Sequence, residues 1–336
     1  MRIIVPLIAV LALTLIAYAG AQAGMTYFFG VVIPYVAFAV FLVAFMLRIL
    51  KWASIPVPFR IPTTCGQQFS MPWIKQNKID NPSTTGGVII RMFLEIFLFR
   101  SLFRNTKTEI WPGGKLSYGS AKWLWLAGLA FHYSFLVILV RHLRLFTQPV
   151  PFFVEVLEFG DGFLQLAVPT FYLTDAVILL AVTYLFVRRI GIPQVRYISL
   201  AADYFPLFLI FAIGLSGILM RYFYKTHVVG IKELTIGLAT FSPTVPEGIG
   251  SIFYVHVFLV STLFAYFPFS KLMHLGGVFL SPTRNLPNDT RMHRHINPWN
   301  PTVKIHTYDE YEDEFRDVMV EAGIPVEKGG DQAKSA

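Results

Sequence analysis

Long apolar runs, separated by short polar or basic connections, dominate the pattern along this chain. A helix needs about 20 apolar residues to cross the hydrocarbon core of a bilayer, and the runs approach or exceed that length. We predict membrane-spanning helices at residues 4–19, 28–47, 123–140, 163–187, 205–224 and 250–280. A cleaved signal peptide is the alternative interpretation of the first run, and it would leave five spanning helices. The pattern predicts an all-α integral membrane protein, a bundle of about six transmembrane helices.

Two stretches outside these runs have a different pattern. Residues 87–103 mix large apolar side chains with Arg91 and Glu95, which predicts an amphipathic helix that lies at the membrane interface or packs on the end of the bundle. Residues 281–336 are polar, and an acidic helix is expected to begin at Thr307. We expect this tail to dock on a cytoplasmic partner, and a tail that is simply solvated is the alternative. The predicted segments are two N-terminal helices (1–47), a cytoplasmic loop (48–122), a four-helix core (123–280) and a cytoplasmic tail (281–336).

Composition and charge support this class and give it an orientation. Of the 336 residues, 55% are hydrophobic and only 14% are charged, against about a quarter charged in soluble domains. Basic residues are concentrated in 48–122, in 188–204 and from Lys271 onward, and few lie in the other connections. The positive-inside rule then places both termini in the cytoplasm and predicts a multi-pass protein of the cytoplasmic membrane. The basic residues form no nucleic-acid motif, so the expected partner is the lipid bilayer and not nucleic acid.

The chain has a single cysteine, Cys65. One thiol cannot form an internal disulfide or hold an iron–sulfur cluster. A covalently attached c-type haem is excluded too, because the sequence has no C-x-x-C-H motif. We therefore interpret Cys65 as a plain structural residue.

Four of the eight histidines lie within or at the ends of apolar runs, where ionisable groups are costly and usually functional. His132 and His142 are ten residues apart on the third predicted helix, a rise of about 15 Å. His256 and His274 are eighteen apart on the sixth, which is five full turns and about 27 Å of a straight helix. If these helices are antiparallel, His132 faces His274 and His142 faces His256. Two pairs at different depths suit two six-coordinate b-type haems, each bound between two helices.

The unequal rises require a tilt or a kink, and Pro268 is the candidate position for a kink. For any single histidine, a hydrogen bond to a neighbouring helix is the plain alternative. Four histidines at two depths cannot surround one tetrahedral zinc ion. A metal transporter lined by the same histidines stays an open alternative of another class.

These residues carry a resemblance to known proteins. "FHYSFLVILVRH" and "YVHVFLVSTLFAYFPFSKLMH" resemble the di-haem cytochrome b subunit of respiratory nitrate reductases, over roughly residues 120–280. "VPFRIPTTCGQQ", "PWIKQNKIDNPSTTGG" and the tail "HTYDEYEDEFR" resemble a narrower family, DsrM, the haem b membrane subunits of DsrMKJOP complexes. The resemblance implies that five of the helices form a cytochrome b core. It also implies two haem b groups, held by His132 with His274 and by His142 with His256.

The same resemblance implies a role and partners. The chain would be the electron-transfer subunit of a membrane quinol:acceptor oxidoreductase, with menaquinone or menaquinol as its diffusible substrate. A cytoplasmic iron–sulfur subunit like DsrK would exchange electrons with it and carry the reduction of the final substrate. Further membrane and periplasmic subunits would complete the complex, in dissimilatory sulfur metabolism such as sulfate reduction. A di-haem anchor of another quinol-linked oxidoreductase is the alternative.

Several charged residues near the histidines complete the candidate site. Asp175 appears as an acid inside the fourth apolar run, which suggests proton handling at a quinol site or a hydrogen bond between helices. Arg141, Arg144 and Arg221 lie on the outer side under the predicted topology, and Lys271 lies one turn before His274. These four cations are candidate partners of haem propionates, or alternatively anchors at the membrane interface.

Overall fold

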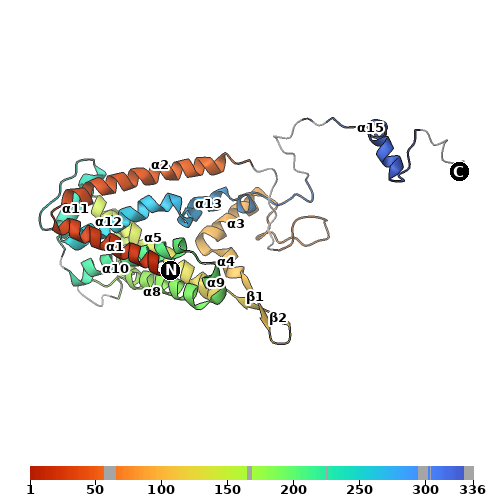
Figure 1. Cartoon of the computed structure of the whole chain (residues 1–336). Coiled ribbons are helices and arrows are strands. Elements are labelled where there is room, and N and C mark those ends of the chain that lie inside the picture. Colours follow the sequence, from red (N-terminus) through yellow and green to blue (C-terminus); the bar gives the residue numbers. More distant parts are fainter. Residues whose placement is uncertain (57–65, 165–168, 225, 294–301, 303, 329–336) are drawn as a thin grey trace. The chain divides into compact units, whose positions relative to one another are not determined.

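The computed structural model describes residues 1–56, 66–164, 169–224, 226–293, 302 and 304–328 (Figure 1). Cys65 lies outside this range. The chain forms two compact units, Met1–Met292 and His293–Ala336. The first contains the helical bundle and the second contains one described helix, α15 (Tyr308–Glu321).

Six long helices form the bundle. They are α1 (Ile4–Gln22), α2 (Ile33–Ala53), α5 (Lys122–Arg141), α8 (Leu173–Gly191), α10 (Ala201–Ile218) and α12 (Ser251–Tyr266). The shorter helices of this unit are α3 (Thr85–Leu98), α4 (Arg100–Arg104), α6 (Leu143–Phe146), α7 (Phe152–Asp161), α9 (Pro193–Ile198), α11 (Val228–Ala239), α13 (His274–Leu280) and α14 (Pro282–Asn285). One antiparallel hairpin, β1 (Thr106–Trp111) with β2 (Lys115–Ser120), lies with α3 and α4 at one end of the bundle, and α11 lies at the other (Figure 1).

The predicted membrane-protein class is confirmed. Within the described residues, five helical segments are long and apolar enough to cross a membrane: Ile4–Gln22, Phe28–Ala53, Lys122–Phe146, Ala201–Phe223 and Ser251–Phe269. The fourth predicted run differs. Its helix α8 begins at Leu173 rather than near 163, and it carries Asp175 at its start and Arg188 and Arg189 at its end. α8 packs between α5 and α10.

The core lies where α1, α10 and α12 meet. Leu209, Leu234 and Leu259 are almost completely buried there, together with Tyr254 and Ala17. Apolar side chains on the outer faces of the spans, such as Met46 and Leu136, are instead exposed. In a bilayer this outer surface meets hydrocarbon, and the helices satisfy their own backbone polar groups.

A single sixth helix over 250–280 is wrong, because α12 ends at Tyr266. Two 3₁₀ turns follow, Phe267–Phe269 and Lys271–Met273, and a new helix begins at His274. Pro268 lacks the N–H that would continue the helix, and Ser270 is extended (φ −110°, ψ 178°). His256 and His274 therefore belong to different helices, and the rise of a straight helix between them does not apply.

The segment that precedes α3 is tied to the chain that follows α14. The backbone N–H of Asn288 donates to the carbonyl of Pro82 (2.7 Å), and Gln68 Nε2 donates to Thr290 Oγ1 (2.8 Å). Residues up to Met292 thus belong to the first unit. Beside this contact, Asp80 is paired with Arg100 (2.9 Å) and Arg104. Burial alone would raise the pKa of the Asp80 carboxyl, but these two cations hold it below its usual value.

The second unit bears out the helix predicted from Thr307. The Thr307 hydroxyl accepts a hydrogen bond from the N–H of Glu310, and the Glu310 carboxylate accepts one from the N–H of Thr307, which is a capping box. Asp309 and Glu310 lie in the first turn, where the helix dipole stabilises negative charge.

Candidate functional site

The four histidines of the apolar runs come together as two pairs. In the first pair, His132 on α5 and His274 at the start of α13, the ring centres are 6.0 Å apart and the rings are almost perpendicular (86°). His132 Nδ1 donates to the carbonyl of Gly128 (2.7 Å), and His274 Nδ1 donates to the carbonyl of Lys271 (2.9 Å). Because a carbonyl can only accept, each Nδ1 carries the hydrogen and each Nε2 carries the lone pair.

The second pair has a different geometry. His142, at the end of α5, and His256, on α12, have ring centres 6.3 Å apart and nearly parallel rings (8°). His142 Nδ1 donates to the carbonyl of Ile138 (2.7 Å). The Ser216 hydroxyl on α10 donates to Ile213 (2.9 Å), so it accepts from His256 Nδ1 (2.9 Å). In this pair too, each Nε2 carries the lone pair.

Both separations fit a metal ion shared by two imidazoles. A nitrogen–metal bond is about 2 Å long, and the ring centre lies about another 1 Å behind the nitrogen, so two rings that share a metal have centres roughly 6 Å apart. The Nδ1 hydrogen bonds set the tautomer that axial ligands need and orient the rings. The residues therefore fit two bis-histidine haems. Among the described residues, no three His, Cys, Asp or Glu side chains gather to hold a metal ion.

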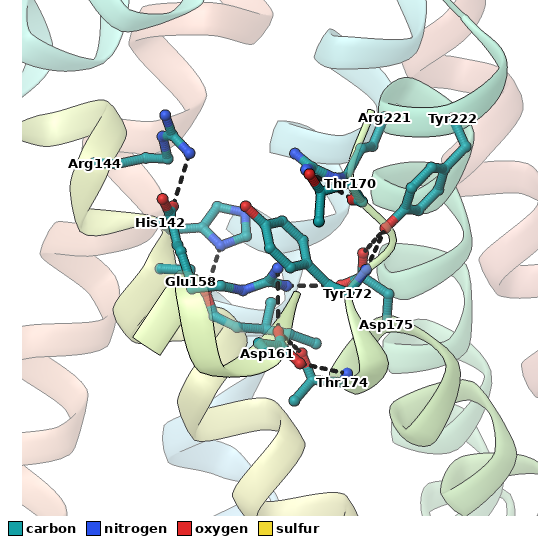
Figure 2. Close-up of polar contacts among 12 residues, drawn as sticks. His142, Arg144, Glu158, Asp161, Thr170, Tyr172, Thr174, Asp175, Arg221 and Tyr222 are labelled. Carbon is teal, nitrogen blue, oxygen red and sulfur yellow. Dashed lines mark hydrogen bonds and ion pairs between the residues drawn. The ribbon is translucent and has the colours of Figure 1, made fainter. Parts of the chain in front are cut away.

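A buried ionic cluster lies beside the second pair (Figure 2). Arg141 precedes His142 and contacts two carboxylates, Asp175 (2.7 Å) and Asp161 (3.2 Å). Tyr222 donates its hydroxyl hydrogen to the other oxygen of Asp175 (2.8 Å). The Arg141 guanidinium also lies 3.8 Å from the ring centre of Tyr172. Asp175 is thus in the first turn of α8 and ion-paired, and its expected position well inside a spanning run is wrong.

The other predicted cations also have protein partners. Arg144 pairs with Glu158 (2.8 Å). Arg221 donates to the carbonyl of Thr170 (3.0 Å), and its guanidinium lies 4.1 Å from the ring centre of Tyr172 (Figure 2). Contacts between these arginines and haem propionates stay a prediction.

Near the first pair, Lys271 pairs with Asp203 (2.6 Å), a residue that the sequence interpretation missed. Asp203 accepts from the N–H of Leu200 (2.9 Å) at the start of α10, and Arg189 lies 3.7 Å away. The predicted run began at 205, so Asp203 was assigned to a connection. An acid in the first turn before an apolar run is a helix-start signal, and it could have identified this residue.

A membrane-spanning helical bundle with paired histidines is the architecture of a membrane b-type cytochrome. Residues 92–294 match the nitrate reductase gamma subunit family, and the chain belongs to that family. It is 48% identical over 280 residues to the Hdr-like menaquinol oxidoreductase cytochrome b-like subunit of Archaeoglobus fulgidus, covering 81% of this chain and 83% of that relative. The subunit of the same name from Archaeoglobus profundus is 43% identical over the same shares. The predicted resemblance is confirmed at the level of the family.

Proposed function

We propose that this chain is the di-haem b electron-transfer subunit of a membrane quinol oxidoreductase complex. The observation that carries the proposal is the presence of two histidine pairs whose ring centres lie 6.0 and 6.3 Å apart, with every Nδ1 hydrogen-bonded. The printed names of the two Archaeoglobus relatives support menaquinol as the diffusible substrate.

His132 and His274 would hold one haem iron, and His142 and His256 the other. Bound haem supplies a one-electron carrier at each pair. With two histidines for each iron, a bound haem would have no free position for oxygen, so these sites would supply electron transfer rather than oxygen binding. The four Nδ1 hydrogen bonds keep the rings oriented and their Nε2 atoms unprotonated.

The distribution of basic residues between the two ends of the bundle supports a cytoplasmic electron partner. The basic connections share the end of the bundle that carries the first pair, and the positive-inside rule assigns that end to the cytoplasm. On the resemblance to DsrM, we propose that an iron–sulfur subunit like DsrK lies on the cytoplasmic side and binds the tail. The same resemblance suggests further membrane and periplasmic subunits and a role in dissimilatory sulfur metabolism. Co-purification that identifies an iron–sulfur protein of a different kind would instead favour the anchor of another quinol-linked oxidoreductase.

We retain Asp175 as the proposed group for proton handling during quinol oxidation, near the second pair. Its carboxylate contacts Arg141 (2.7 Å), and the Tyr222 hydroxyl, 2.8 Å away, carries an exchangeable proton beside it. Asp175→Asn keeps the shape and removes the proton acceptor. Unchanged quinol oxidation in this variant, with both haems retained, would eliminate the role. Arg141, Arg144, Arg221 and Lys271 stay the proposed partners of propionates.

A reduced-minus-oxidised optical spectrum, with a haem assay on the purified chain, tests the di-haem proposal. We expect b-type bands and two haems per chain. His132→Ala or His274→Ala should remove one haem, and His142→Ala or His256→Ala the other, each about half of the haem. His306→Ala, in the second unit, is the matched control and should keep both. A chain without haem, as a metal transporter would be, contradicts the proposal, and so does a shared haem between His132 and His256.

A further inference from the structure

Helix α3 has one buried face, which includes charged residues, and one exposed face, which is apolar. Val88 and Arg91 are buried, and Glu95 is ion-paired with Arg284 and accepts from the Ser101 hydroxyl. The other face presents a stripe at helical spacing, exposed by 47% to 64%: Ile89, Ile90, Phe93, Phe97 and Leu98. An exposed apolar stripe of this size needs a partner.

The C-terminal end of α3 lies against the side of α5, within a membrane span. Trp125 Nε1 donates to the carbonyl of Leu98 (2.7 Å), and the Tyr133 hydroxyl donates to the carbonyl of Phe97 (2.9 Å). Tyr133 lies about 17 Å along α5 from Lys122. The 25-residue span that contains it is about 37 Å long, and this length exceeds the thickness of a hydrocarbon core, about 30 Å. Helical side chains lean toward the N-terminus, so the Tyr133 contact falls in the half of the span nearer Lys122 and inside the hydrocarbon. Trp125, about 4.5 Å along α5 from Lys122, makes its contact at the edge of the hydrocarbon.

The backbone reverses where α3 ends. Phe99 is left-handed (φ 49°), and α4 follows in the return direction, with Arg100 and Arg104 reaching Asp80. The last carbonyls of a helix lack intrahelical donors, and in hydrocarbon each unpaired one costs several kcal/mol. Trp125 and Tyr133 supply donors to two of them. The side chains of Arg100 and Arg104 thus reach back to Asp80, before the start of α3, and two carbonyls beside the turn have donors from α5.

From this geometry we propose that α3 and α4 form a re-entrant hairpin that enters the bilayer from the end of the bundle shown with the β-hairpin (Figure 1), with the stripe in contact with lipid acyl chains. The span that α3 contacts, α5, also exposes apolar side chains such as Leu126 and Leu136, and lipid acyl chains cover such a surface in a bilayer, which identifies lipid as the occupant of the stripe. At the turn, the Phe99 ring lies 4.9 Å from the His132 ring. The hairpin therefore covers the first histidine pair on that side. This inference does not depend on haem.

Spin labels on the full chain in liposomes test the proposal. In a Cys65→Ser background, labels at Phe93→Cys and Ile90→Cys should collide frequently with dissolved oxygen and rarely with a water-soluble nickel chelate. Leu136→Cys on α5 is the lipid reference, and Ile110→Cys on β1, 78% exposed, is the aqueous reference. We expect both α3 labels to match Leu136→Cys, with chelate accessibility at least about fivefold below that of Ile110→Cys.

Two results would overturn the proposal. Labels as accessible to chelate as the β1 label would place α3 in water, and labels protected from both reagents would place the stripe against protein. Two positions guard against a local disturbance by one label. Far-ultraviolet circular dichroism and gel filtration verify the fold without relying on bound haem, so a failure of the di-haem proposal is recognised separately.

Discussion

The two histidine pairs reach almost the same ring separation by different local means. In the second pair, His142 ends a regular helix and His256 lies within one, and the rings are nearly parallel. In the first pair, His274 follows two 3₁₀ turns and starts a new helix, and the rings are almost perpendicular. The ring separation is therefore the feature that the two pairs share, whereas the ring orientation follows from the local chain.

The surroundings differ as well. The first pair has aromatic neighbours, because Phe99 and Phe131 both place their rings 4.9 Å from His132. The second pair adjoins the ionic cluster of Arg141, Asp161 and Asp175. Buried ions cost several kcal/mol each unless they are paired, so stability near the second pair depends strongly on charge balance.

Arg141→Ala should give the largest effect, because it leaves two buried carboxylates without their cation. We expect a loss of about 3–5 kcal/mol in stability and loss of the haem at the second pair before that at the first. Thermal unfolding in detergent and haem content measure both. Arg144→Ala is the matched control, since Arg144 is half exposed and its pair should contribute about 0–1 kcal/mol. Equal effects of the two variants would refute the contrast.

Ser216→Ala should change only the haem that we propose at the second pair. The Ser216 hydroxyl accepts from His256 Nδ1, which makes the imidazole a stronger donor and favours the oxidised iron. Loss of about 1 kcal/mol from one hydrogen bond corresponds to a rise of about 40 mV in one midpoint potential. A potentiometric titration resolves the two steps. Ser134→Ala is the control, because Ser134 donates within α5 to Ala130. A shift in both potentials would count against the assignment.

Asp203→Asn should give the smallest effect, at the haem that we propose at the first pair. Without the carboxylate charge, Lys271 is left as an uncompensated cation near His274 and favours the reduced iron. Because Lys271 is 73% exposed, water and salt screen the effect to about 10–20 mV upward. Asn keeps an oxygen for the N–H of Leu200. The double variant with Lys271→Gln should return toward the original potential. If it does not, Lys271 does not act through its charge.

Much of the fold could be predicted from hydropathy, because spanning helices are long and apolar. The helix break before His274 could not, since Pro268 is compatible with a kink as well as with a break, and the extended Ser270 decides between them. The sequence interpretation also missed α11 and the β1–β2 hairpin, whose strands are largely exposed and lack a buried alternating face.

The juxtaposition of His132 with His274 and of His142 with His256 could be predicted, because antiparallel helices leave only this pairing by depth. The ring orientations could not, since they depend on where each Nδ1 finds an acceptor, and one acceptor is Ser216 on a third helix. The partners of Arg141 and Lys271 could not be predicted either. Asp161 and Asp203 lie outside the predicted spans, although both are buried against them.

The break at Ser270 also means that His256 and His274 are held by different parts of the chain. His256 belongs to a long helix that is clamped by α1, α2 and α10, whereas His274 stands on a short tether. That tether leads through α13 to Arg284 and Asn288, which are fastened to Glu95 and Pro82. The position of His274 therefore depends on the residues that Arg284 and Asn288 contact. A movement of α3 is therefore transmitted to both histidines of the first pair, to His274 through this short segment and to His132 through Phe99.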